Sequence, residues 1–194
     1  MDIKNHIKQR AGELLPELIR VRRHIHENPE LSFQEFETAA FVESELQALG
    51  LKTQRLANTG VVAIIEGKNP SKKVVGLRAD MDALPIVEVS DGREYRSKKE
   101  GVMHACGHDV HTTSLLGAAK LLTELKDQFE GSVKLVFQPG EEKLPGGASL
   151  MIADGVLENP KIDVMIGQHV MPGIETGKTG FRAGLYMAST DEIY

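Results

Sequence analysis

The pattern of hydrophobic and polar positions near the N-terminus predicts an amphipathic helix. Between about Ile3 and His26, Lys, Arg and Glu side chains fill one face, and Asn28-Pro29 ends the pattern. Pro16 interrupts the pattern and is expected to kink or restart the helix. The apolar residues expected near the opposite face are Ile3, Ile7, Leu14, Leu18 and Val21.

A second helix is predicted to follow Ser32-Phe-Gln-Glu35, which matches a capping box, and to stop at Gly50. It is expected to bury Phe36, Ala40, Phe41 and Leu49. Apolar runs predict strands at residues 51–56, 61–66, 74–79, 133–138 and 163–169, the last two buried on both faces. Further helices are predicted at residues 111–126 and 146–154. This alternation predicts an α/β fold.

Polar clusters follow three of the predicted strands. Asp80 and Asp82 come after one strand, the paired acids Glu141 and Glu142 after the next, and His169 ends the last. In open α/β sheets, ligands bind outside the carboxyl ends of the strands. Candidate ligands are therefore expected to collect at one rim of the sheet.

The segment GVMHACGHDVH, residues 101–111, places the only cysteine of the 194 residues among three histidines. Thiolate and imidazole are ligands of zinc and of neighbouring transition metals. In the acid pair Glu141-Glu142, one carboxylate could bind metal while the other moves protons. Together these groups are the inventory of a metal-assisted hydrolase.

Each feature also has a purely structural interpretation. A lone cysteine is usually a small buried hydrophobe, and the acid pair could be a solvated turn. Asp80 and Asp82 could cap a helix or a turn. His24 and His26 are interpreted as solvated or supporting side chains. The metal-site interpretation is favoured because His108 lies two residues from Cys106 and because the acids directly follow a buried strand.

Composition excludes several other classes of protein. A net charge of −5, three Tyr, six Phe and no Trp disfavour a nucleic-acid partner. One cysteine cannot form an internal disulfide, and no apolar run approaches the ~20 residues that span a bilayer. We therefore expect no membrane association and a cytoplasmic location.

Five motifs in order give the chain a family resemblance. RRHIHENPELSFQE, LRADMDALP, GVMHACGHDVHTTSLLGAA, FQPGEE and GQHV together resemble the metal-dependent aminoacylase/carboxypeptidase family. Its members include hippurate hydrolases, bacterial N-acyl-amino-acid amidohydrolases and plant auxin-conjugate hydrolases. The resemblance implies an aminopeptidase-like catalytic domain whose central mixed, largely parallel sheet is covered by helices. It also implies two divalent metal ions, zinc or manganese, with cobalt or nickel possible.

The resemblance assigns roles to individual residues. Cys106 would bridge both metals, with His108, Glu142 and His169 as further ligands, and Glu141 would be the general base that takes a proton from water. Arg78 stands where related enzymes carry the histidine of an HxD motif, so no ligand is assigned to that strand. The residues expected to support the ligands are Asp80, Asp82, Asp109 and His111.

The implied activity is hydrolysis of the non-peptide amide bond of N-acyl amino acids, with acetyl or aromatic acyl groups. A dipeptidase or carboxypeptidase on the same scaffold, or an inactive metal-binding remnant, are the alternatives. Family members are about twice this length. Residues 1–185 are therefore predicted to be the N-terminal part of the catalytic domain, and residues 186–194 the start of an inserted dimerisation domain. We expect the full-length form to be a homodimer and the 194-residue chain alone to be inactive.

Overall fold

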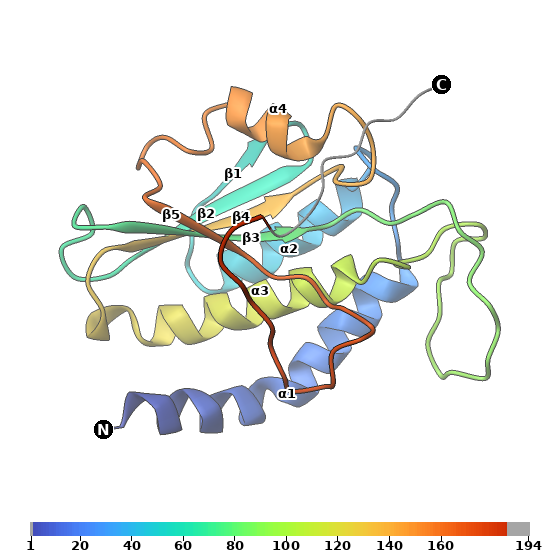
Figure 1. The fold of residues 1–194 in the computed structure, drawn as a ribbon, viewed down its shortest axis with the longest axis horizontal. Helices are drawn as coiled ribbons and strands as arrows, with labels where there is room; N and C mark the ends of the chain where they lie inside the picture. The colour runs from blue at the N-terminus through green and yellow to red at the C-terminus, as the bar shows by residue number, and fades with distance from the viewer. Residues whose placement is uncertain (1, 186–194) are drawn as a thin grey trace.

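The structure is a computed structural model that describes residues 2–185, and it confirms the α/β fold. Two helices and three strands come first, and helices and strands alternate after them (Figure 1). The predicted start of a dimerisation domain, residues 186–194, lies outside the described residues. The elements in order are α1 (Ile3–Glu27), α2 (Phe36–Ala48), β1 (Thr53–Leu56), β2 (Gly60–Glu66), β3 (Val74–Asp80), α3 (His108–Glu124), the 3-10 turn η1 (Lys126–Gln128), β4 (Ser132–Gln138), α4 (Gly147–Ala153) and β5 (Val164–Gly167).

The five strands form one mixed sheet in the order β1-β2-β4-β3-β5. β1 pairs with β2, and β2 with β4, in antiparallel register. β3 runs parallel to both β4 and β5. The carboxyl ends of β3, β4 and β5 therefore meet at one rim, as parallel pairing requires.

Two hydrophobic cores cover the two faces of the sheet. In β4, Leu135 and Phe137 point to the larger core, built with α1, α2 and α3, whereas Val136 points to a smaller core with Met151 of α4. Figure 1 shows α1 and α3 on one side of the sheet and α4 on the other. All seven residues of β4 are buried, which confirms a central strand with both faces covered.

The N-terminal helix continues through Pro16 instead of restarting there. Figure 1 shows α1 changing direction part-way along its length. A proline inside a helix removes one backbone hydrogen bond and bends the helix, which accounts for the change of direction. Leu14 and Val21 are buried where α1 packs on α3, while Ile3 and Ile7 at the free end are about 40% exposed.

The capping-box prediction for α2 was wrong. Glu35 is the N-cap residue, but its side chain makes no capping bond. The carboxylate of Glu30 instead accepts from the backbone N–H groups of Glu37 and Thr38. The predicted buried face was also wrong at two positions, because Phe36 is 53% exposed and Ala40 is exposed. The buried face carries Thr38, Ala39, Val42 and Leu46.

The last predicted strand is shorter and more exposed than expected. β5 spans Val164–Gly167, and all four residues are exposed. β5 is the edge of the sheet and pairs only with β3 among the described residues. A continuous apolar run therefore did not mean burial here, since burial requires elements on both sides of the strand.

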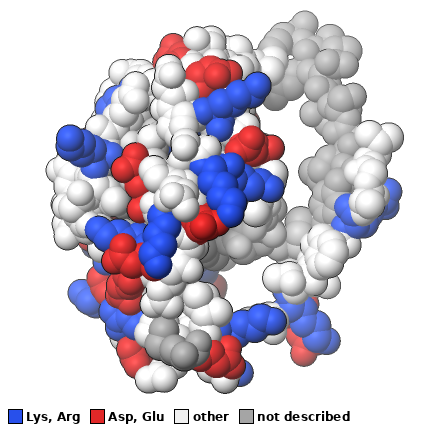
Figure 2. Space-filling view, turned by 90° about the vertical axis from the view of Figure 1, so that its left-hand side faces the viewer, with Lys and Arg blue, Asp and Glu red and all other residues white. Residues whose placement is uncertain are grey.

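The surface shown in Figure 2 mixes basic and acidic side chains without a large area of one sign. In residues 2–185, none of the helices has the length and apolar character needed to cross a bilayer.

Candidate metal centre

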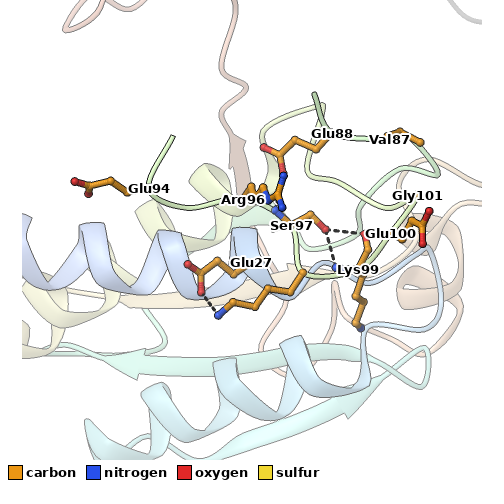
Figure 3. Close-up of a pocket in the computed structure, with 10 residues that line it drawn as sticks. Glu27, Val87, Glu88, Glu94, Arg96, Ser97, Lys99, Glu100 and Gly101 are labelled. Atoms are coloured by element: carbon orange, nitrogen blue, oxygen red, sulfur yellow. Dashed lines mark hydrogen bonds and ion pairs between the residues drawn. The ribbon is translucent and has the colours of Figure 1, made fainter. Parts of the chain in front are cut away.

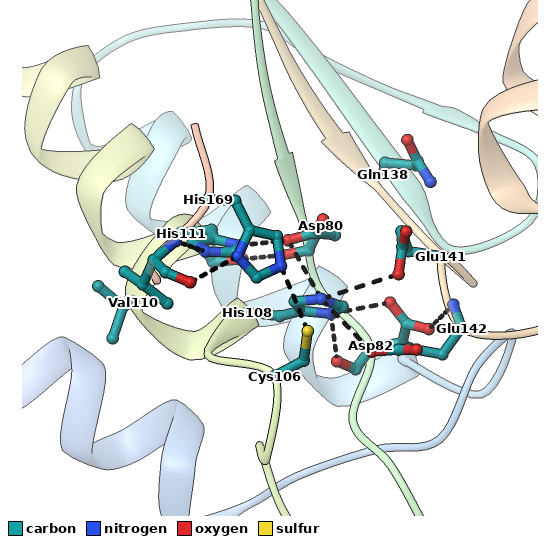
Figure 4. A network of polar contacts seen from close by, with 12 residues as sticks. Asp80, Asp82, Cys106, His108, Val110, His111, Gln138, Glu141, Glu142 and His169 are labelled. Atoms are coloured by element: carbon teal, nitrogen blue, oxygen red, sulfur yellow. Dashed lines mark hydrogen bonds and ion pairs between the residues drawn. The ribbon is translucent and has the colours of Figure 1, made fainter. Parts of the chain in front are cut away.

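The rim where the parallel strands end gathers polar side chains from four separate segments (Figure 4). Asp80 ends β3, and the Glu141-Glu142 pair follows β4. His169 follows β5, and His108 begins α3. Segments far apart in the sequence therefore converge on one small region, which we call the rim cluster: Asp80, Asp82, Cys106, His108, Glu141, Glu142 and His169.

The start of α3 depends on Gly107. This residue is the N-cap, and its φ of +90° lies in the left-handed region that favours glycine. A Cβ atom there would stand only 2.4 Å from Cγ2 of Val170. Gly107 thus allows the chain to turn sharply between Cys106 and His108, so that both side chains face the same rim. It also begins the helix three residues before the predicted start.

The orientation of His108 is set by a backbone carbonyl. Its Nδ1 lies 2.8 Å from the carbonyl oxygen of Asp82, and an N–H is the group that can donate to a carbonyl. Nδ1 therefore carries a proton, and Nε2 is the nitrogen whose lone pair can bind a metal. Nε2 is buried and has no hydrogen-bond partner. This arrangement is typical of a histidine that binds metal through Nε2.

Three carboxylates surround that lone pair. His108 Nε2 lies 3.7 Å from Asp80 Oδ1, 3.7 Å from Glu142 Oε1 and 3.9 Å from Glu141 Oε2. The Glu142 side chain is 23% exposed and that of Glu141 is 41% exposed. One ligand atom from each of His108, Glu141 and Glu142 lies within 4.8 Å of the others.

A second group of donors shares His108. Ligand atoms of Cys106, His108 and His169 also lie within 4.8 Å of one another, and Cys106 Sγ is 3.3 Å from His169 Nε2. The Nδ1 of His169 lies 2.6 Å from the carbonyl oxygen of Val170, so it is the protonated nitrogen. Its Nε2 lone pair faces the thiol. The two groups meet at His108, which suits two cations held side by side.

His111 lies beside the rim cluster and contacts it through Asp80. Its Nδ1 lies 2.6 Å from Asp80 Oδ1, and its Nε2 accepts a 2.9 Å hydrogen bond from the backbone N–H of Val170. Both ring nitrogens are therefore in use. Asp80, His108 and His111 form a third cluster close enough for a metal, but the occupied Nε2 of His111 disfavours that set.

Asp82 connects the histidine to the acid pair. Its Oδ1 lies 3.3 Å from His108 Nδ1, and its Oδ2 accepts hydrogen bonds from Ser32 Oγ at 2.7 Å and from the Glu142 backbone N–H at 2.9 Å. Asp82 thus contacts two candidate ligands, His108 through its ring and Glu142 through its backbone N–H.

Burial and neighbouring charges shift the pKa values of the rim cluster. Burial would raise the pKa of Asp80, but the hydrogen bond from His111 and the nearby His108 and Arg78 lower it to about 2. Burial lowers the pKa of His108, yet Asp82 and the other carboxylates outweigh this and raise it overall. Burial and the acids, Glu142 first, raise the pKa of Cys106 to about 12. Burial and the Glu142 carboxylate raise the pKa of Glu141.

The rim cluster fits divalent metal ions. His108 Nε2 is buried and has no hydrogen-bond partner, and such an atom costs free energy unless something binds it. The surrounding groups are carboxylates, imidazoles and a thiol, which suit zinc and related cations. A dication would also reverse the excess of negative charge that keeps Cys106 protonated.

Asp109 is the candidate residue that the structure does not bring to the rim. Its Oδ2 lies 2.8 Å from His26 Nδ1 and 2.7 Å from Arg22 Nε, on the other side of the helix start. His26 Nε2 in turn lies 2.9 Å from Glu88 Oε1. We call Arg22, His26, Glu88 and Asp109 the α1 cluster. His26 is 2% exposed, so the interpretation of this histidine as solvated was wrong.

Sequence reasoning missed two buried residues beneath the rim, Ser32 and Glu35. Ser32 bonds Asp82, and Glu35 accepts from the backbone of Gly140, next to the acid pair. Both were assigned to the cap of α2. The available signal was the density of acids in ENPELSFQE, because acids are rarely fully buried unless they are paired.

A cavity of about 530 Å³ lies away from the rim (Figure 3). It opens between Glu27 of α1 and the loop of residues 87–101, and its walls alternate acids such as Glu88 and Glu94 with bases such as Arg96. It holds no cysteine or histidine, and it contacts the α1 cluster only through Glu88. The chemistry of the rim is therefore not located in this cavity.

Known proteins share both the sequence and the fold. The N-acyl-L-amino acid amidohydrolase of Geobacillus stearothermophilus is 46% identical over 98% of this chain and 51% of its own length. Thermostable carboxypeptidase 2 of Saccharolobus solfataricus is 44% identical over 98% of this chain and 48% of its own length. The chain thus spans about half the length of these curated relatives.

A solved structure is also similar to this chain in sequence and fold. The YXEP protein of Bacillus subtilis, described as a dinuclear metal binding peptidase from the M20 family, superposes with a TM-score of 0.78 at 39% identity. The match covers 84% of this chain and 44% of that one. Residues 76–190, more than half of the chain, match the family described as Peptidase family M20/M25/M40. The chain belongs to Peptidase family M20/M25/M40.

Proposed function

We propose that this chain supplies the metal-binding part of an amidohydrolase that cleaves N-acyl amino acids. The observation that carries the proposal is His108, whose buried Nε2 lone pair has no partner and faces acids on one side and Cys106 on the other. The amidohydrolase from Geobacillus, 46% identical to this chain, supports the substrate class.

Cys106, His108, Glu142 and His169 would hold two divalent cations, zinc or manganese. When bound, these ions would supply Lewis acidity toward the amide carbonyl and toward a nearby water. Cys106 would serve both, because its sulfur lies 3.3 Å from His169 Nε2 and also contacts the Glu142 carboxylate. Asp82 would keep the His108 ring in the tautomer that leaves Nε2 free.

Glu141 would be the general base. Of the two acids it is the more exposed, and it is not tied to Asp82 as Glu142 is by its backbone N–H. Its carboxylate would take the proton of the attacking water and then deliver it to the nitrogen of the leaving amine. The products are a carboxylic acid and a free amino acid.

We propose that residues 1–185 form the first part of the catalytic domain and that the full-length protein is a homodimer. A second candidate function is carboxypeptidase or dipeptidase activity, which the similarity to Thermostable carboxypeptidase 2 favours.

The test uses full-length protein purified without chelator or nickel affinity resin. Elemental analysis should find about two divalent ions per chain, and hippurate or N-acetylmethionine should be hydrolysed faster than dipeptides. A clear preference for dipeptides would select the second function. Protein that binds no zinc or manganese at all would contradict both.

A further inference from the structure

The segment between α1 and α2 contacts the rim cluster from beneath without offering a metal ligand. Its two acids, Glu30 and Glu35, are 7% and 0% exposed. Glu30 caps α2 by accepting from the backbone N–H groups of Glu37 and Thr38 and from the Thr38 hydroxyl. Glu35 also accepts three hydrogen bonds, but two of its donors lie in other segments of the chain.

The Glu35 carboxylate joins three separate segments. Its Oε1 accepts from the backbone N–H groups of Phe33, at 2.9 Å, and Gly140, at 2.8 Å. Its Oε2 accepts from the Thr59 hydroxyl at 2.7 Å, just before β2. A fully buried carboxylate with three donors is geometrically well defined, since each donor restricts the position of the others.

Gly140 lies in the short loop that carries the acid pair. Its φ is +52°, and a Cβ atom there would meet the Phe33 ring at 2.3 Å. The loop backbone is therefore pressed against the segment that holds Glu35. The far end of the same loop is fixed by the hydrogen bond from the Glu142 N–H to Asp82, which Ser32 also holds.

We propose that Glu35 is a positioning residue, which holds the Gly140–Glu142 loop so that Glu141 and Glu142 face His108. This inference rests on the proposed metal-dependent function. Glu35 touches neither the metals nor the substrate in this scheme, and it acts through the backbone of Gly140. Small displacements of such a loop matter, because general-base and ligand geometry tolerate only fractions of an ångström.

The experiment compares Glu35→Ala, Glu35→Gln and the control Glu30→Ala in the full-length protein. Glutamine keeps an oxygen for the two backbone N–H groups, and its amide can donate to the Thr59 hydroxyl. Glu30→Ala removes a buried acid with three hydrogen bonds from the same segment but none to the rim loop. Amide exchange of residues 140–144 is measured without metal, and Co²⁺ affinity is followed through the absorption of its bond to the Cys106 thiolate.

Glu35→Ala should raise amide exchange at Gly140 at least about tenfold and weaken Co²⁺ binding by about 10–100-fold, as loss of outer-shell support does. Glu35→Gln should stay within about threefold of the wild type on both readouts, and Glu30→Ala should lower the melting temperature without changing either. Equal loop exchange in Glu35→Ala and Glu30→Ala would overturn the proposal. If the wild type bound no Co²⁺, the metal-dependent function would fail, and the exchange of the loop would still decide the role of Glu35.

Discussion

His108 and Asp109 are consecutive residues of α3, but their side chains enter two different clusters of buried charged groups. The two clusters differ in how many of their polar atoms have partners. His108 points into the rim cluster, where its buried Nε2 has no hydrogen-bond partner. Asp109 points into the α1 cluster, where His26 uses both ring nitrogens, on Asp109 and Glu88. Both clusters surround a buried histidine with carboxylates, so residue type alone does not separate them.

The difference shows how a binding site can be told from a structural ion network. In the α1 cluster, cations and anions lie within the same set, with Arg22 and His26 against Asp109 and Glu88. In the rim cluster, the acids outnumber the basic groups, and the Nε2 of His108 lies among three of them without a hydrogen-bond partner. Unused buried lone pairs are costly, so they persist where a ligand satisfies them.

The largest expected effect is on kcat, which should depend on the rim cluster and not on the α1 cluster. Glu141→Gln in the full-length enzyme should lower kcat by ~10²–10⁴-fold and keep the metal content, because a general base is lost but no ligand is. Steady-state kinetics and elemental analysis measure both. Glu88→Gln, in the α1 cluster, is the control and should leave kcat within a few-fold. If Glu141→Gln lost the metals and Glu142→Gln retained them, the two roles would be exchanged.

The next effect is on the free energy of unfolding, which should depend more on the α1 cluster than on the rim cluster. Asp109→Asn should lower the free energy of unfolding by about 3–5 kcal/mol, since it removes the buried carboxylate that pairs with both His26 and Arg22. Glu142→Gln, measured in the presence of chelator, should cost little or even stabilise, because it removes one charge from a crowded acidic site. Urea unfolding of both variants tests the contrast. Equal losses would mean that the rim acids are as fully paired as those of the α1 cluster.

The smallest effect is a pH dependence that belongs to the α1 cluster. The hydrogen bond to Asp109 raises the pKa of His26 against its burial, with Glu88 also raising it and Arg22 opposing. A raised pKa in the folded state adds stability that is present below the ordinary value of 6.5 and lost as pH rises through the folded value. The pKa of Asp109 is lowered, so its contribution is lost only in acid.

The stability difference between the wild type and His26→Gln should therefore be largest near pH 6 and shrink toward pH 9. The change should be on the order of 1 kcal/mol, the difference between a charged and a neutral hydrogen bond. Chemical denaturation at each pH measures it. A difference that grew with pH would show that His26 is neutral in the folded protein and that Asp109 is paired mainly with Arg22.

The order of elements and the place of the rim could be predicted from the sequence. Periodicities of 3.6 and 2 residues indicate helices and strands directly, and strand ends of one direction meet at one rim. The strand ends at Asp80 and Glu141 therefore indicated the rim before any fold was known. The exposure of β5 could not be predicted, because an apolar run does not show what covers it.

What only the tertiary structure decided is which buried groups are paired with which. His108 and Asp109 are neighbours in the chain, yet the α-helix turns them about 100° apart, toward the rim cluster and toward α1 respectively. Glu35 reads as a helix cap, but its partner Gly140 lies 105 residues away. Local sequence determines the backbone conformation of each segment. The partners of a buried charge come from distant segments, and only their packing sets which lone pairs are satisfied and which are left for a ligand.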